Sequence, residues 1–423
     1  MILHVVQQGE TLDAIARRYT VSVRRLALEN GLAQGKPLVP GQVLAVLYPL
    51  QTVQVRRGET LAALSRRTGV SRRQIWRCNP GLLAGQEPQA GRRLILRYRQ
   101  RLLGRLETSG YAYPGTRKEL LFASLPAMER ALPFAHAVTR QGGLSPLDSD
   151  DMLQALQEAG TKPVLSVANL RDGEFDGALV HAILGSEEAQ KRLIAEIGAK
   201  LKTGPYAGVD LDFELIPAAD RERYPSFLQR LSDAVAPDGY KVRTAVAAKN
   251  SDNASGRWVE GLDYAAIGKA VSAVLLMTYD YGYASGPAQA VAPLPQVRET
   301  LRYAVTRIPR EKILLGIPNY GYNWPLPYEA GKTRARSVTN EEAIDLARTA
   351  GVAIQYDEQV QTPWFRYTED GTQREVWFED ARSLRAKLRL AVQFGLRGVG
   401  FWNLSRPFRQ GWTVLSALVC FET

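Results

Sequence analysis

The sequence GVDLDFE at residues 208–214 alternates apolar and acidic residues. Successive side chains of a β-strand point to opposite faces, so Asp210, Asp212 and Glu214 share one face and the apolar residues share the other. If the apolar face packs against helices, the three acids line the interior of a barrel. Neighbouring buried carboxylates raise one another's pKa, and an acid that stays protonated near neutral pH suits general acid catalysis. The pattern therefore predicts a catalytic strand, with Glu214 nearest the open end of the barrel.

Two alternatives explain the acidic strand without such catalysis. The apolar partner face argues against an edge strand that exposes its acids to solvent. A Mg²⁺ site is disfavoured because no Gly-rich phosphate-binding loop accompanies the acids. Two cysteines, Cys78 and Cys420, and three histidines leave little room for a zinc site and exclude a disulfide scaffold. We expect neither a metal nor another cofactor.

Strand-like runs alternate with helical stretches from about residue 105 onward. The eight runs lie at residues 106–113, 132–139, 163–170, 208–215, 242–248, 273–281, 313–322 and 398–404. Strands that alternate with helices favour a parallel sheet, and eight such units favour an α/β fold that closes as a (β/α)8 TIM barrel. The connection after strand 7 is too long for a barrel loop, and it contains a helical stretch at 340–349. We predict a small α+β insertion there, at about 323–381.

The first hundred residues contain an internal repeat. Gly9-Glu10-Thr11-Leu12 recurs as Gly58-Glu59-Thr60-Leu61, and Asn30 recurs as Asn79. In each copy a β-prone stretch leads into a Gly-Glu-Thr turn, two helices, a second turn and a last strand. We predict two small βααβ modules at 1–49 and 50–99, followed by the barrel at 100–423.

The positive charge is concentrated in this repeat. Residues 1–100 hold 16 Lys+Arg against 5 Asp+Glu, whereas residues 101–423 hold 38 of each. A basic patch suits nucleic acid, a membrane surface or an acidic cell wall, although it could also be a solvated surface. The repeat lacks the aromatic rows of single-strand binders, so we expect no nucleic-acid partner. No run approaches the roughly 20 apolar residues of a membrane span, and residues 1–7 do not read as a secretory signal.

The GETL motifs, the central Asn and the late Pro-Gly together resemble the LysM module over residues 3–99. That resemblance implies binding to N-acetylglucosamine-containing glycans such as peptidoglycan and chitin. It places the sugar groove between the first strand–helix loop and the loop before the last strand. The implied glycan-binding residues are Gly9, Glu10, Thr11 and Leu12, with Gly58, Glu59, Thr60 and Leu61 in the second copy. The alternative is that these residues only cap helices and turn the chain.

Residues 105–423 resemble the family 18 glycoside hydrolases. GVDLDFE matches the strand-4 signature D-x-x-D-x-D-x-E, except that its first Asp is Ala207, at a position expected deepest in the barrel. The segment Met277-Thr278-Tyr279-Asp280 after strand 6, Trp402 after strand 8 and the insertion also agree. In strand 3 the family's Ser-x-Gly-Gly is replaced by Ser166-Val167-Ala168-Asn169.

This resemblance implies retaining hydrolysis assisted by the substrate, in which the acetamido oxygen of the −1 sugar attacks its own anomeric carbon. Glu214 would protonate the leaving oxygen and later activate water. Asp212 would orient the acetamide and stabilise the oxazolinium charge, and Tyr279 would hydrogen-bond the acetamide oxygen. The implied substrate-binding residues are Asp210, which supports Asp212, and Met277, Asp280, Trp402, Asn169 and Tyr111. Met277 and Trp402 could instead be barrel core, and Tyr279 a structural hydrogen-bonding residue.

Two LysM modules ahead of this barrel resemble the spore cortex-lytic N-acetylglucosaminidases, as do the strings GYAYP, MTYDYGYASGP and EVWFEDARS. The resemblance implies cleavage of N-acetylglucosaminyl bonds in cortex peptidoglycan during germination. It also implies production in the mother cell without a signal peptide and deposition in the spore coat or cortex. We expect a monomer. The rival hypotheses are a chitinase or another N-acetylglucosamine-oligomer hydrolase, and a catalytically silent glycan-binding protein.

Overall fold

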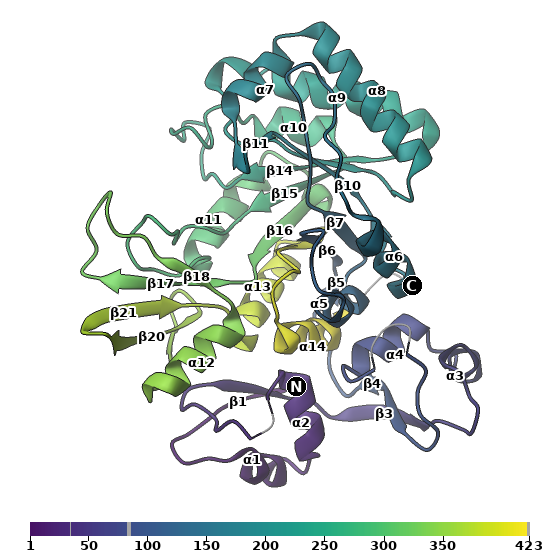
Figure 1. Cartoon of the computed structure of the whole chain (residues 1–423), viewed down its shortest axis with the longest axis vertical. Coiled ribbons are helices and arrows are strands. Elements are labelled where there is room, and N and C mark those ends of the chain that lie inside the picture. The colour runs from purple at the N-terminus through teal and green to yellow at the C-terminus, as the bar shows by residue number, and fades with distance from the viewer. Residues whose placement is uncertain (34, 83–85, 421–423) are drawn as a thin grey trace.

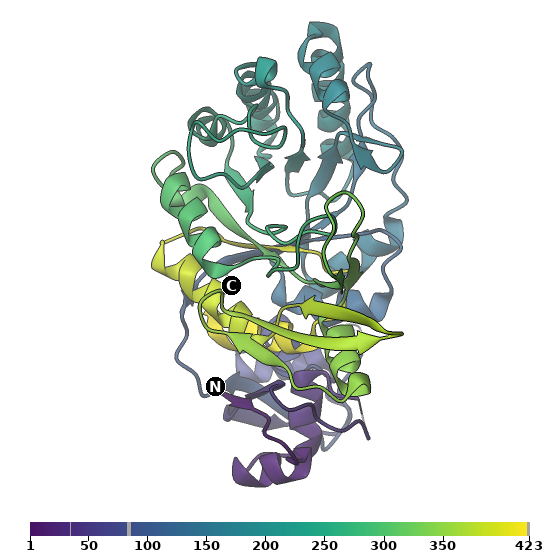
Figure 2. The ribbon, with the colours of Figure 1, turned by 90° about the vertical axis from the view of Figure 1, so that its left-hand side faces the viewer.

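The computed structural model describes residues 1–33, 35–82 and 86–420. Two small N-terminal modules lie at one end of the molecule, the barrel occupies the other end, and the insertion lies at the side (Figure 1). Turning the molecule brings the insertion in front of the barrel, with the modules still below (Figure 2). Helix α14 (Arg409–Leu418) lies between the barrel and the modules.

Each module has the predicted order of strand, two helices and strand. The first contains β1 (Ile2–Val5), α1 (Leu12–Arg18), α2 (Val23–Asn30) and β2 (Val43–Val46). The second contains β3 (Pro49–Gln54), α3 (Leu61–Thr68), α4 (Arg72–Cys78) and β4 (Arg93–Tyr98). The two strands of each module pair antiparallel, and each module has its own apolar core.

The repeated Asn ties the second helix of each module to the last strand. The side-chain amide of Asn30 donates to the carbonyls of Leu26 and Ala45, and its Oδ1 accepts from Ala45 N at 2.7 Å. Asn79 makes the same three bonds to Ile75 and Ile95. Both Asn side chains are buried, so the repeat at this position is explained by the architecture of the module.

Eight strand positions form the predicted barrel. They are β6 (Glu107–Ala112), β7 (Arg130–Pro133) with β8 (His136–Ala137), β9 (Lys162–Pro163) with β10 (Leu165–Ala168), β13 (Val209–Asp212), β14 (Val242–Ala247), β15 (Ala273–Met277), β16 (Ile313–Pro318) and β22 (Gly398–Trp402). All neighbours in this series pair parallel. Strands 2 and 3 are each interrupted, and the barrel closes because β7 pairs with β9 while β8 pairs with β10.

Helices surround the barrel. They include α5 (Lys118–Ser124), α6 (Asp150–Ala159), α7 (Gly177–Leu184), α8 (Glu187–Thr203), α9 (Arg223–Val235), α10 (Tyr264–Ala270), α11 (Leu294–Ala304) and α13 (Ala381–Gln393). The main apolar core lies between them and the strands. Phe213, from the apolar face of the acidic strand, stacks on Tyr224 and Phe227 of α9 at ring distances of 6.1 and 6.5 Å. The apolar face therefore packs against the helices, as the alternation predicts.

The insertion is a five-stranded antiparallel sheet with one helix. It contains β17 (Gly321–Leu326), β18 (Arg336–Val338), α12 (Asn340–Ala350), β19 (Gln355–Asp357), β20 (Thr362–Glu369) and β21 (Thr372–Trp377). The run predicted as strand 7 is two strands, because β16 ends at Pro318 and β17 already belongs to the insertion. A side chain at Gly321 would collide with the carbonyl of Trp377, so this glycine lets β17 lie against β21.

Two further details complete the fold. Ala207 is exposed and lies before β13 begins, so the expectation that it is the deepest position of the barrel was wrong. No helix in the part of the chain that the structure describes is both long and apolar enough to cross a bilayer.

Candidate active site

The three acids of the strand-4 segment lie at the end of the barrel where the parallel strands finish. Asp210 and Asp212 are on β13 and are 1% and 3% exposed. Glu214 is half-buried, two residues beyond the end of the strand. Leu215 follows with a φ of 57°, a left-handed conformation that is unusual for a branched apolar residue. The chain therefore turns sharply after the third acid.

Asn169 holds the backbone of Glu214 in place. Glu214 N donates to Asn169 Oδ1 at 2.8 Å, and Asn169 Nδ2 donates to the carbonyls of Glu214 at 3.0 Å and Asp176 at 2.9 Å. The Asn169 side chain is fully buried. The structure thus places this predicted substrate-binding residue behind Glu214, where it fixes the position of the acid.

The surroundings of the acids raise their pKa values. Burial, together with the charge of Asp210, raises the pKa of Asp212 to about 8. Burial raises the pKa of Glu214 well above its ordinary 4.5, and the charges of Asp212 and Asp280 raise it further. Burial also raises the pKa of Asp210, but the Arg243 guanidinium and a hydrogen bond from Tyr111 oppose that shift. A Glu214 carboxyl with a raised pKa keeps its proton to a higher pH than a free glutamate, which suits a general acid.

Tyr279 lies among these acids. Burial, followed by the charges of Asp212 and Glu214, raises the pKa of its phenol well above 10, so the hydroxyl keeps its proton and can donate a hydrogen bond. Gly316 on the neighbouring strand makes room for the Tyr279 ring, since a Cβ there would lie 2.8 Å from Tyr279 Cε1. Tyr279 therefore presents a protonated hydroxyl close to Asp212 and Glu214.

An aromatic cluster lies beside the acids. Trp402 ends β22 and lies 4.8 Å from Phe134 and 5.5 Å from Tyr111, measured between ring centres. Met277 packs against the same cluster at the end of β15. Tyr111 also donates its hydroxyl to Asp210 Oδ2 at 2.7 Å, so one buried side chain joins the aromatic cluster to the acid row.

Asp280 connects the site to the insertion. It follows β15 with a φ of 58°, and its Oδ1 accepts hydrogen bonds from Tyr320 at 2.7 Å and Tyr322 at 3.4 Å. Burial of the carboxylate raises the pKa of Asp280, and the two tyrosines oppose that rise. Sequence reasoning missed Tyr320, Tyr322 and Phe134. Phe134 lies between β7 and β8, and Tyr320 and Tyr322 lie just beyond β16. Aromatic residues within the strand-like runs at 132–139 and 313–322 are the signal that could have found them, since barrel sites gather at strand ends.

In both modules the Gly-Glu-Thr motif forms the turn and cap before the first helix. Thr11 and Thr60 each accept a backbone hydrogen bond that caps the helix. The Glu10 carboxylate accepts from Gln7 N at 2.9 Å, and Glu59 accepts from Arg56 N at the same distance. Glu10 also pairs with Arg18 and His4, and Glu59 with Arg67. Leu12 is half-buried and Leu61 is buried, while Gly9 and Gly58 adopt positive φ values in the turns.

The chain is similar to known carbohydrate-active proteins along its full length. The model of the glycosyl hydrolases family 18 matches residues 152–406, and that of the LysM domain matches residues 4–46 and 53–97. A cortical fragment-lytic enzyme of Bacillus subtilis is 34% identical over 425 residues, which cover 98% of this chain and 97% of the relative.

Solved structures agree with this relationship. The Bacillus cereus spore cortex-lytic enzyme SleL superposes with a TM-score of 0.83 at 30% identity, covering all of this chain and 98% of SleL. A chitinase of Chromobacterium violaceum superposes with a TM-score of 0.68 at 25% identity, covering 74% of this chain and 98% of the chitinase. The predicted fold class, enzyme class and modules are confirmed: the chain is a glycoside hydrolase that belongs to family 18 and carries two LysM domains.

Proposed function

We propose that this enzyme cleaves N-acetylglucosaminyl bonds in spore cortex peptidoglycan, with retention of configuration and through an oxazolinium intermediate. The observation that carries the proposal is the buried acid row that ends at Glu214, whose pKa stays far above its ordinary value beside Asp212 and Tyr279. The cortex as substrate is supported by the near full-length similarity to the cortical fragment-lytic enzyme and to SleL.

In the proposed reaction Glu214 donates its proton to the glycosidic oxygen as the bond to the leaving sugar breaks. The acetamido oxygen of the −1 sugar attacks the anomeric carbon and forms the oxazolinium ring. Glu214, now ionised, then takes a proton from the water that opens this ring. Asn169 supports both steps, because its two hydrogen bonds fix the backbone that carries Glu214.

The neighbouring residues act on the acetamide and the sugar ring. Asp212 orients the acetamide and stabilises the positive charge of the oxazolinium, while Asp210 supports Asp212. The Tyr279 hydroxyl donates to the acetamide oxygen. Trp402 forms the floor under the −1 sugar, with Met277 and Tyr111 packed around it. Asp280 contacts the same sugar from the side of the insertion.

The modules and the relatives support where the enzyme acts. LysM modules bind N-acetylglucosamine-containing glycans, and residues 1–100 carry the positive charge that suits anionic cortex peptidoglycan. We propose that the modules hold the enzyme on the cortex, through the turns at residues 9–12 and 58–61. We further propose that it is a monomer made in the mother cell, deposited in the spore and active during germination.

The test compares wild-type protein with Glu214→Gln on cortex fragments and on chitin oligomers, with new reducing ends identified by mass spectrometry. New N-acetylglucosamine ends from cortex, reduced at least about 100-fold in the variant, are expected because a general acid contributes that much. Turnover of chitin oligomers alone would replace the cortex with chitin, the second candidate, which the similarity to the Chromobacterium chitinase favours. Binding without products from either substrate would overturn the enzymatic proposal.

A further inference from the structure

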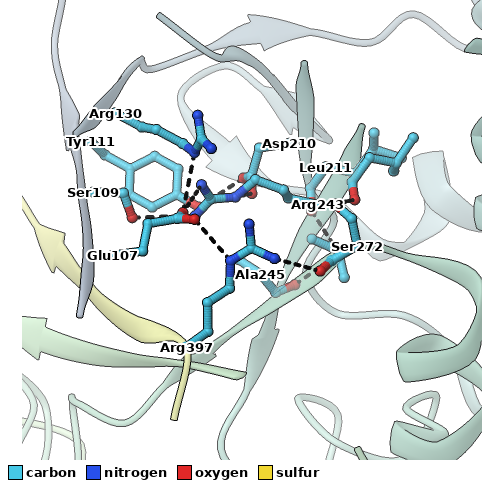
Figure 3. Close-up of polar contacts among 12 residues, drawn as sticks. Glu107, Ser109, Tyr111, Arg130, Asp210, Leu211, Arg243, Ala245, Ser272 and Arg397 are labelled. Atoms are coloured by element: carbon cyan, nitrogen blue, oxygen red, sulfur yellow. Dashed lines mark hydrogen bonds and ion pairs between the residues drawn. The ribbon is translucent and has the colours of Figure 1, made fainter. Parts of the chain in front are cut away.

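A buried arginine lies beneath the acid row. Arg243 is on β14, in register with Asp210 on β13, and is 6% exposed. Its Nη1 donates to Glu107 Oε1 at 2.8 Å, its Nη2 donates to Ser109 Oγ at 3.2 Å, and its Nε lies 3.9 Å from Asp210 Oδ1. Figure 3 shows the guanidinium between Glu107 and Asp210 inside the barrel. This arginine therefore connects Glu107 and Ser109 of β6 with the first acid of the site.

Glu107 fixes the position of Arg243 from below. Its carboxylate also pairs with Arg130 Nε at 3.2 Å and with Arg397 Nε at 2.8 Å (Figure 3). Burial would raise the pKa of Glu107, but the charges of Arg243, Arg130 and Arg397 outweigh it and hold the pKa at about 2. Glu107 is thus ionised throughout the working range of an enzyme and anchors the guanidinium permanently.

Asp210 is held from two sides. Tyr111 donates to Oδ2, while Oδ1 faces Arg243 Nε, and neither Oδ1 nor that Nε has a hydrogen-bond partner among the described residues. The neighbours of Asp210 also include Ser166, its register partner on β10, and three titratable groups: Asp212 on its own strand, Tyr279 after β15 and Tyr224 on α9. Among these groups Arg243 alone is a cation.

A buried carboxylate without a compensating charge takes up a proton. An arginine does not lose its proton in a protein, so its charge is constant across the pH range. We propose that Arg243 is a positioning residue for the hydrolysis: its anchored charge keeps Asp210 ionised beneath Asp212. The proposal rests on the proposed roles of the acid row, but not on which glycan the enzyme cleaves.

The ionised Asp210 has two effects on its neighbour. It favours the protonated form of Asp212 at rest, and it stabilises the positive charge that forms next to Asp212 during the reaction. Without Arg243, Asp210 would retain its own proton to higher pH and both effects would be lost over that range. The acidic limb of the pH–rate profile is therefore the property that Arg243 controls.

The first experiment records kcat and KM against pH for wild type, Arg243→Gln, Arg243→Lys and Arg397→Gln. We expect Arg243→Gln to move the acidic limb of kcat up by about one pH unit, equivalent to a tenfold loss of kcat on that limb, with KM nearly unchanged. Arg243→Lys should restore part of the shift. Arg397→Gln is the matched control, because it also pairs with Glu107 but does not face Asp210. A profile of Arg243→Gln that superposes on wild type, or an equal shift in Arg397→Gln, would overturn the proposal.

A second experiment needs no substrate, so it separates this proposal from the proposed function. Infrared spectra of protein labelled with ¹³C-aspartate follow the protonated carboxyl band with pH, in Asp212→Asn and in Asp212→Asn/Arg243→Gln. The band should persist to a pH about one unit higher in the double variant, since Asp210 is then the remaining acid of β13. Coincident titrations would refute the role of Arg243. If the glutamine variant does not fold, Arg243→Met takes its place, because methionine fills similar space without a charge.

Discussion

The two LysM domains have the same fold, but they face the rest of the enzyme differently. The first docks through the turn before its last strand: Ile354 N of the insertion donates to Pro40 O at 2.8 Å, and Arg382 donates to Gly41 O. A side chain at Gly41 would lie 1.7 Å from Ile354 O, whereas one at Gly91, the matching glycine of the second module, would meet nothing within 4 Å.

The second module docks through its second helix. Arg73 on α4 donates to Pro126 O at 3.0 Å, and Trp76 lines a pocket together with Phe122 and Pro126. The two modules also differ in charge, with five Lys+Arg and three Asp+Glu at 1–49 but eleven and two at 50–99. The first module is therefore attached to the insertion through its turn at Gly41. The matching turn of the second module at Gly91 is uncovered, and the second module carries most of the positive charge.

Alanine at the two matched glycines gives the largest expected difference. Both have positive φ values, 82° at Gly41 and 79° at Gly91, so both variants lose about 1–2 kcal/mol through backbone strain. Gly41→Ala must also displace the backbone of Ile354, and we expect a total loss of about 3–5 kcal/mol. Urea unfolding measures the difference, and limited proteolysis reports release of the first module. Equal losses at the two positions would contradict attachment of the first module through the contact between Gly41 and Ile354.

A change in the barrel tests whether pH-dependent stability arises away from the modules. Asp212 keeps its proton up to a pKa of about 8 when folded, against 3.8 ordinarily, so the native state binds the extra proton and loses stability as pH rises from about 4 to 8. Asp212→Asn removes this loss. Its stability relative to wild type should rise by roughly 1 kcal/mol per pH unit in that window. Urea unfolding at pH 5, 6.5 and 8 checks this, and parallel curves would contradict it.

The repeated asparagines allow a finer comparison. Asn30→Ala and Asn79→Ala each remove three buried hydrogen bonds, and we expect each to cost about 2 kcal/mol. Asn30 also accepts from Gln410 Nε2 at 2.9 Å, a contact that Asn79 lacks among the described residues. Asn30→Ala should therefore cost about 1 kcal/mol more, and Gln410→Ala should reduce that difference. If Asn30→Ala costs the same in the wild-type protein and in Gln410→Ala, the hydrogen bond to α14 contributes nothing.

The smallest expected effect concerns charge. Arg57→Gln/Arg66→Gln in the second module and Arg17→Gln/Arg24→Gln in the first each remove two exposed cations. At low salt the Arg57/Arg66 variant should weaken retention on anionic peptidoglycan about threefold. The Arg17/Arg24 variant should weaken it less, because the second module has the larger positive charge. A pull-down series from low to high salt measures this. A stronger effect of the first-module pair would reverse the comparison.

Local patterns allowed most of the fold to be predicted. The repeat located both modules, and the alternation in GVDLDFE located the strand whose apolar face packs on α9. Strand ends were less certain: the run at 313–322 continues into β17 because no local signal separates the barrel from the insertion. The hydrogen bond between Pro40 and Ile354 could not be predicted, since it joins residues far apart in the chain.

The site divides in the same way. Sequence motifs identified the acids, Tyr279 and Trp402, which the structure places around one end of the barrel. Asn169 was expected to bind substrate, but its side-chain amide donates hydrogen bonds to the backbone carbonyls of Glu214 and Asp176. The roles of Arg243 and Glu107 could not be predicted, because each is a single charged residue within a strand. Their ion pair forms only because β6 and β14 approach each other across the barrel.

Helix α14 has a consequence for the order of assembly. It contacts both modules, and its Gln410 donates to Asn30 and to the carbonyl of Val43. Yet α14 is the last helix of the described chain, so a ribosome finishes it long after the modules have emerged. Domains generally fold as units during synthesis. The modules must therefore fold with their docking faces still exposed, and they reach their final positions only after α14 has been translated.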